Sequence, residues 1–138
     1  MTLLPSRRAA VSPVMDRLAR YMAGASAAPL PAAVAEKTKH HVIDTLAAMV
    51  SGTTLAPGKL AVSFAQAHGG VKEASIAGTR TRTSAMTAAL ANGMTAHADE
   101  TDDSHQPAFY HPGCAIVPAA LAGGEREDAS GRSLLRAV

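Results

Sequence analysis

The chain has 138 residues, of which 47% are hydrophobic, 3% aromatic and 17% charged, and its formal net charge is +2. This length is enough for one domain with its own hydrophobic core, while the scarcity of aromatic residues argues against an all-β sandwich or barrel. The single cysteine excludes an internal disulfide, and the 13 basic residues are dispersed, which argues against nucleic-acid binding. No run of about 18 apolar residues occurs, so we expect no membrane association and a cytoplasmic location.

Apolar residues at helical spacing, together with capping residues, predict an all-α chain. Residues 1–12 are expected to form a flexible lead, and residues 13–138 one helical domain. Ser12 is a candidate N-cap for a first helix that begins at Pro13 and ends near Gly24.

The second helix has the strongest helical pattern in the chain. Pro31 opens it, apolar residues then recur at helical spacing, and Gly52 is expected to cap its end. His40 and His41 lie in this helix, where we expect ordinary surface or partly buried side chains.

The middle of the chain predicts two more helices separated by an extended piece. A short third helix is expected over about 58–67, followed by at most one short strand near 74–77 and then a loop. Ser84 is a candidate cap for a fourth helix over 85–97. Gly93 inside that Ala-rich helix is unfavourable by about 1 kcal/mol relative to Ala, which predicts that another backbone approaches it closely.

The last two helices follow a loop that ends at His111. The fifth helix is expected over 112–122, and the glycines at 123–124 are expected to end it. Asp128 or Ser130 begins a sixth helix, which continues to the end of the chain.

The candidate chemistry lies in the segment 97–113. Four acidic residues fall within 99–103, and no Lys or Arg occurs between Arg82 and Arg126, so histidines are the only local cations. Negative charge after the C-terminal end of a helix is disfavoured by the helix dipole. Such a conflict between local stability and composition is expected at a functional site.

The spacing of this segment suggests acid–base chemistry. If the fourth helix continues through Ser104, the side chains of His97, Glu100 and Ser104 share one helical face. His111 stands before the start of the fifth helix, where the helix dipole disfavours the imidazolium, so it is a candidate base. The alternative interpretation is an acidic, solvated helix end with an incidental histidine.

A metal site is a second alternative for the same segment. His97, His105 and His111, with the carboxylates, could supply ligands to Zn, Mn or Fe. The histidines and acids show no HxxxH, HExxH or EF-hand spacing, so we expect no metal. Cys114 is expected to be a small buried side chain.

Several motifs of this sequence resemble the MmgE/PrpD family, which includes 2-methylcitrate dehydratase, cis-aconitate decarboxylase and iminodisuccinate epimerase. The resemblance extends from about residue 14 to the end of the chain. The motifs that carry it are the residues at 42–47, 74–78, 89–93 and 96–105, and His111-Pro112-Gly113. The resemblance implies a large helical domain, usually in a dimer, that acts on small di- and tricarboxylates without metal or organic cofactor. The shared chemistry is proton transfer at a carbon next to a carboxylate.

The resemblance also implies roles for individual residues. Carried over position by position, it implies catalytic roles for Glu100, Ser104 and His111, with Glu where many members have Asp and Ser where Thr is common. Three further residues are expected to support the substrate loop: Asp102, Asp103 and His105.

The sequence departs from the family in the second half of the site. Family members are longer, and they use a second histidine and lysines from later segments to complete the site and hold substrate carboxylates. We therefore expect this chain to be the amino-terminal part of a lyase such as a 2-methylcitrate dehydratase, truncated at its C-terminus and inactive alone. The expected partners are a second copy or the missing C-terminal part. The alternatives are a non-catalytic remnant or subunit that needs a partner chain, and a small metal-binding helical protein.

Overall fold

The computed structural model describes residues 11–25 and 27–138 and confirms the all-α prediction. The described α-helices are α1 Pro13–Ala25, α2 Ala32–Gly52, α3 Ala56–His68, α4 Ala85–Ala96, α5 Gly113–Arg126 and α6 Gly131–Ala137. None of these described helices has both the length and the apolar character needed to cross a membrane. Most of the expected flexible lead, residues 1–10, lies outside the described residues. The chain divides into two compact units, Met1–Leu30 and Pro31–Val138.

The described part of the first unit contains α1. The Ser12 hydroxyl accepts a hydrogen bond from the Met15 backbone N–H at 3.2 Å, which confirms the predicted cap. One turn later, Arg20 Nε lies 2.9 Å from Asp16 Oδ2 in an exposed pair at i,i+4 spacing. Such pairs add only a few tenths of a kcal/mol to a helix.

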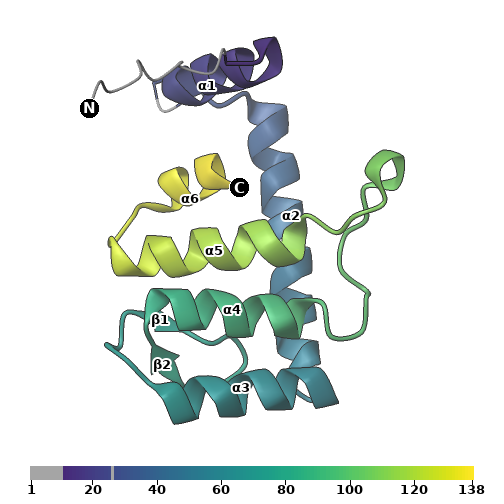
Figure 1. Cartoon of the computed structure of the whole chain (residues 1–138), viewed down its shortest axis with the longest axis vertical. Helices are drawn as coiled ribbons and strands as arrows, with labels where there is room; N and C mark the ends of the chain where they lie inside the picture. Colours follow the sequence, from purple (N-terminus) through teal and green to yellow (C-terminus); the bar gives the residue numbers. More distant parts are fainter. Residues whose placement is uncertain (1–10, 26) are drawn as a thin grey trace, which may run out of the picture. The chain divides into compact units, whose positions relative to one another are not determined.

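The second unit is a layer of helices crossed by one long helix. Figure 1 shows α3, α4 and α5 side by side, with α2 running across them, and α6 packs on α5 and α2. Small side chains fill the larger buried cluster, which consists of Ala61, Ala65, Ala74, Ile76, Ala88, Ala91 and Ala122. The second buried cluster is Met49, Ala96 and Val117. Because most of these residues are alanines, the helix backbones can approach one another closely.

Gly52 is required by helix packing and not by a helix cap. It is the last residue of α2, and the next residue, Thr53, keeps a right-handed helical conformation, so the predicted glycine cap is wrong. A Cβ atom at Gly52 would overlap the carbonyl oxygen of Thr95 in α4. The prediction for Gly93 is confirmed, because a Cβ there would lie 2.9 Å from the carbonyl oxygen of Cys114 in α5.

The hairpin between α3 and α4 corrects the expectation of at most one strand. β1 (Ala74–Ser75) pairs antiparallel with β2 (Arg82–Thr83), in a segment that was expected to be a loop. The backbone N–H and C=O groups of β1 need hydrogen-bond partners. Gly78 has a positive φ of 71°, which allows the chain to reverse so that β2 supplies these partners. The buried Asn92 side chain of α4 joins the hairpin to the layer of helices. Its Oδ1 accepts from the Ala77 backbone N–H, and its Nδ2 donates to the Ser75 backbone carbonyl oxygen, both at 2.9 Å.

The ends of the last helices are partly as predicted. Ser84 and Ser130 cap α4 and α6 through their hydroxyls, as the sequence indicated. α5 does not end at Gly123 and Gly124 but continues to Arg126. Two helical glycines are unfavourable by about 2 kcal/mol together, which the packing of α5 against α4 can outweigh.

Gly52→Ala is predicted to lower the free energy of unfolding by at least about 2 kcal/mol, because the added methyl group meets backbone that cannot move aside. Gly123→Ala is the matched control, since it is also a helical glycine but nothing lies within 4 Å of its Cβ position. The control should raise stability by about 0.5–1 kcal/mol. Urea denaturation followed by circular dichroism measures both, and equal stability of Gly52→Ala and the natural chain would contradict this packing argument.

Candidate functional site

The loop between α4 and α5 carries the predicted site, and its one helical piece is a short 3-10 helix, η1 (Gln106–Ala108), not a continuation of α4. α4 ends at Ala96, so the expected helical face shared by His97, Glu100 and Ser104 does not exist. Asp99 Oδ1 accepts from the Thr101 backbone N–H and hydroxyl, at 3.3 and 2.8 Å, and Glu100 has a positive φ of 55°. Local side-chain hydrogen bonds of this kind compete with the backbone hydrogen bonds of a helix and favour turns.

Asp102 contacts both histidines that flank the loop, and its side chain is 0% exposed. Its carboxylate lies 3.1 Å from His97 Nδ1 and 3.4 Å from His111 Nδ1. The two imidazole rings are 5.0 Å apart between centroids. The hydrogen bond of His111 Nδ1 is to the backbone carbonyl oxygen of Asp102, at 3.3 Å. Because carboxylate and carbonyl oxygens only accept hydrogen bonds, both Nδ1 atoms carry the proton that faces Asp102, and Nε2 of each neutral ring is its basic nitrogen.

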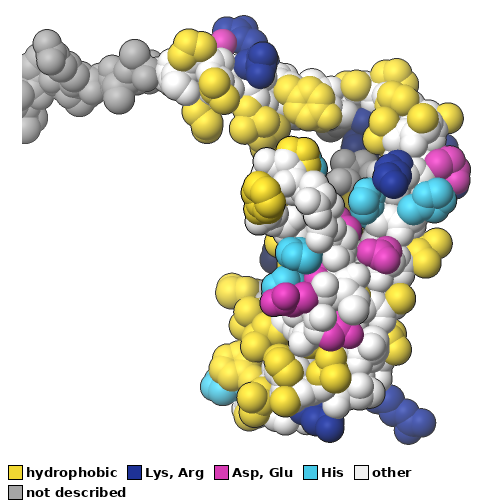
Figure 2. All heavy atoms as spheres, turned by 90° about the vertical axis from the view of Figure 1, so that its right-hand side faces the viewer, with side chains coloured by type: hydrophobic (Ala, Val, Ile, Leu, Met, Phe, Trp, Pro, Cys, Tyr) yellow, Lys and Arg dark blue, Asp and Glu magenta, His cyan; other side chains and the backbone are white. Residues whose placement is uncertain are grey.

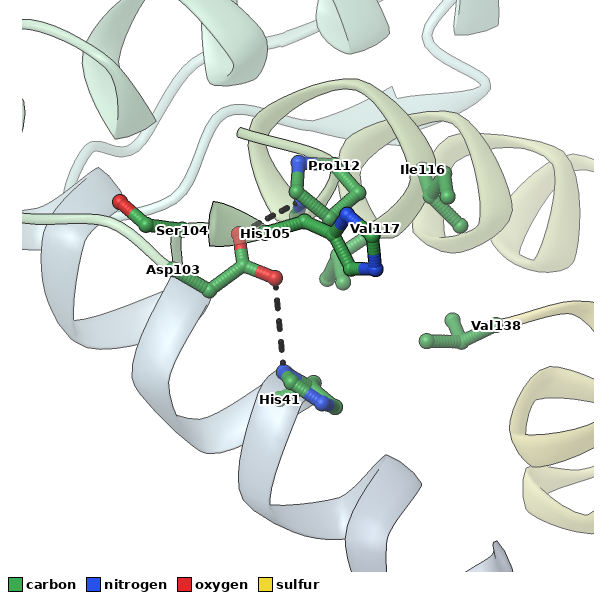
Figure 3. Close-up of a pocket in the computed structure, with 9 residues that line it drawn as sticks. His41, Asp103, Ser104, His105, Pro112, Ile116, Val117 and Val138 are labelled. Carbon is green, nitrogen blue, oxygen red and sulfur yellow. Dashed lines mark hydrogen bonds and ion pairs between the residues drawn. The ribbon is translucent and has the colours of Figure 1, made fainter. Parts of the chain in front are cut away.

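Asp103 joins the loop to two helices. Its Oδ1 accepts from the Gly113 backbone N–H at 2.7 Å, at the first residue of α5, and its Oδ2 lies 3.5 Å from His41 Nδ1 in α2. Figure 3 shows His41 directed from α2 toward this carboxylate. Asp103 therefore satisfies an N–H at the start of α5, where negative charge is favourable.

Two hollows flank the loop. The first, about 240 Å³, has polar residues on one side, including His41, Asp103 and Ser104, and apolar residues such as Ile116 and Val117 on the other. The second, about 210 Å³, extends from Ser104 to His111. Ser104 and His105 line both hollows, so they form a common wall. Figure 2 shows histidine and acidic side chains gathered on the face that carries this loop.

The structure brings most, but not all, of the predicted site residues together. Ser104, His105 and His111 line the second hollow, and Asp102 and Asp103 support the loop from behind. Glu100 is exposed and lines neither hollow. Its catalytic role stays a prediction.

His41 is a site residue that the sequence pattern did not indicate. It was expected to be an ordinary helix residue, but it lies in the first hollow and contacts Asp103. One signal could have found it. His41 is three residues after Thr38 and four before Thr45, both buried, so it shares the inward face of α2.

Cys114 lies behind this cluster, at the start of α5. Its thiol donates to the His111 carbonyl oxygen at 3.2 Å. Burial, with the hydrogen bond and negative charge of Asp102 and the charge of Asp103, raises the pKa of the thiol from 9.0 to about 11. The expectation of a small buried side chain is met in part, since Cys114 is half-buried.

The raised pKa of Cys114 predicts slow alkylation. The thiolate is the reactive form, so the rate of iodoacetamide labelling should rise with a midpoint near pH 11, and near pH 9 in urea-unfolded chain. Cys114 is the single cysteine, so mass spectrometry reads its labelling directly. Asp102→Asn should lower the midpoint by removing a negative neighbour. A midpoint near 9 in the folded protein would contradict this environment.

Comparison with known proteins identifies a family. A family model described as the MmgE/PrpD N-terminal domain matches residues 16–138. No curated protein and no solved structure matches the chain.

Proposed function

Because this chain belongs to the MmgE/PrpD family through its N-terminal domain, we propose that it forms the amino-terminal part of a cofactor-independent lyase. The proposed substrates are small di- or tricarboxylates such as 2-methylcitrate, and the proposed reaction is dehydration. The contact between Asp102 and His111 carries the proposal, since it orients an imidazole at the wall of a hollow. A cytoplasmic homo-oligomer is the form in which we expect it to act.

The proposed reaction begins with His111. With its Nδ1 proton held toward Asp102, Nε2 is free to take a proton from the substrate carbon next to a carboxylate. The electron pair of that C–H bond forms the new C=C bond as the hydroxyl leaves the neighbouring carbon. An acid, for which Glu100 is the candidate, gives the leaving hydroxyl a proton, so that substrate becomes alkene and water.

The remaining loop residues position the reactants. Ser104 lies on the wall common to both hollows, where its hydroxyl can bind a substrate oxygen or the released water. Asp103 fixes the loop against α5 and, through His41, against α2. Holding these groups in place lowers the entropic part of the activation barrier.

The charge of the site supports a need for a partner. Neither hollow has a Lys or Arg among its lining residues, and the carboxylates of the substrate would face Asp103. We propose that the cations come from a second copy or another polypeptide segment. The absence of Lys and Arg from the lining of both hollows also favours the second candidate function, a subunit that has no activity without a partner chain.

The chain alone is predicted to give no detectable dehydration of 2-methylcitrate, because neither of the two hollows described has a Lys or Arg in its lining to hold the substrate carboxylates. The absorbance of the alkene product measures the reaction. Clear turnover by the purified chain, without metal or partner, would contradict the need for a partner.

In the assembled enzyme, His111→Ala is predicted to lower kcat by at least about a hundredfold, the contribution of a positioned acid or base. His40→Ala is the control, since His40 is exposed on α2 and lines neither hollow, and its kcat should stay near that of the natural chain. A near-normal kcat for His111→Ala would remove this histidine from the mechanism.

A further inference from the structure

The close approach of α4 and α5 brings together two side chains that the proposed reaction does not use, His97 and Cys114. Gly93 lets the backbone of α5 approach α4, with the Cys114 carbonyl oxygen 2.9 Å from the Cβ position. His97 lies one helical turn after Gly93. As a result, His97 and Cys114 line one shallow groove between the two helices, together with Gly93 and Ala115.

Three possible metal ligands lie close together here, and two of them, His97 and Cys114, line this groove. A ring nitrogen of His97, a carboxylate oxygen of Asp102 and the sulfur of Cys114 all lie within 4.8 Å of one another. They come from the end of α4, from the loop and from the start of α5. We propose that these three side chains form a binding site for a divalent transition-metal ion of the Zn²⁺ class.

The donor set favours this class of ion. Zn²⁺ binds imidazole nitrogen, thiolate sulfur and carboxylate oxygen, and sites with three protein ligands leave the fourth position to water. Mg²⁺ and Ca²⁺ prefer oxygen ligands and would not select a thiol and an imidazole.

The geometry needs only a small adjustment. Ligands at about 2.0–2.3 Å in a tetrahedron lie roughly 3.3–3.8 Å apart. His97 Nδ1 and the Asp102 oxygen are already 3.1 Å apart, so the remaining approach concerns the sulfur of Cys114. On binding, the ion replaces the proton on His97 Nδ1, the neutral ring carries its proton on Nε2 instead, and the Cys114 thiol releases its proton to water. The His97 side chain is 44% exposed, which leaves a path from the groove to the ligands.

The charge of this region also favours a cation. The Asp102 carboxylate is fully buried, and its ion pairs within the described residues are with histidine rings. Buried carboxylates are normally paired with cations or bound to metals. A bound ion would also take up the negative charge of the Asp102 carboxylate, which lies 3.4 Å from His111 Nδ1. Under the proposed function, on which this consequence alone rests, the ion would inhibit the enzyme.

Titration of the tag-free chain with Co²⁺, a spectroscopic substitute for Zn²⁺, tests the site without any assay of activity. A thiolate bound to Co²⁺ gives a sulfur-to-metal charge-transfer absorption, which binding by histidines alone does not give. We expect this band to saturate at one ion per chain and to be removed by excess Zn²⁺.

Matched variants assign the ligands. Cys114→Ser should abolish the band, and His97→Ala should weaken Co²⁺ binding by more than about a hundredfold, since even outer-shell residues of metal sites change affinity by 10- to 100-fold. His105→Ala is the control, because His105 lies in the same loop but outside the cluster, and its titration should match that of the natural chain. Circular dichroism checks that each variant is folded.

The natural chain decides the proposal even if a variant fails to fold. Absence of the charge-transfer band at saturating Co²⁺ would overturn it. Unchanged binding by folded Cys114→Ser or His97→Ala would overturn it as well.

Discussion

The burial of the Asp102 carboxylate between two histidine rings is the interaction on which the site depends. A buried carboxylate is costly unless charged or hydrogen-bonding partners surround it. The sequence has no Lys or Arg between Arg82 and Arg126, so the partners come from His97 and His111. These two residues flank the loop, one at the end of α4 and one just before α5. Asp102 therefore closes the loop and orients both rings, His97 through its carboxylate and His111 through its backbone carbonyl oxygen.

This arrangement depends on how closely the helices approach. α2 and α4 can cross only because Gly52 lacks a side chain where Thr95 lies, and α4 and α5 approach at Gly93. Gly113, the first residue of α5, also has no room for a side chain. A Cβ atom there would lie 2.5 Å from Asp103 Oδ1, which belongs to the site. The small side chains of the core therefore set the distances between the helices that carry the site residues.

Local signals in the sequence predicted much of the fold. Ser12, Ser84 and Ser130 each begin a helix through a hydrogen bond to a nearby N–H, which depends only on neighbouring residues. The role of Gly52 and the pairing of β2 with β1 could not be predicted in this way, because both depend on residues distant in the sequence.

The sequence predicted which segment carries the site, but it did not predict how the side chains of the site are arranged. Composition alone singled out the loop, and the expected helix through it failed because Asp99 favours a turn. The contact of His41 with Asp103, and that of Cys114 with Asp102, join elements that no spacing rule relates.

The tautomers of His97 and His111 test the role of Asp102 most directly. Two-dimensional ¹⁵N NMR of the imidazole rings distinguishes a proton on Nδ1 from one on Nε2. When these rings are neutral, both should carry the proton on Nδ1 in the natural chain. Asp102→Asn should shift His97 toward the Nε2 form that exposed histidines favour, whereas His111, whose Nδ1 donates to the backbone carbonyl oxygen of residue 102, should keep the Nδ1 form. Rings of the natural chain already in the Nε2 form would contradict an Asp102 that holds both histidines.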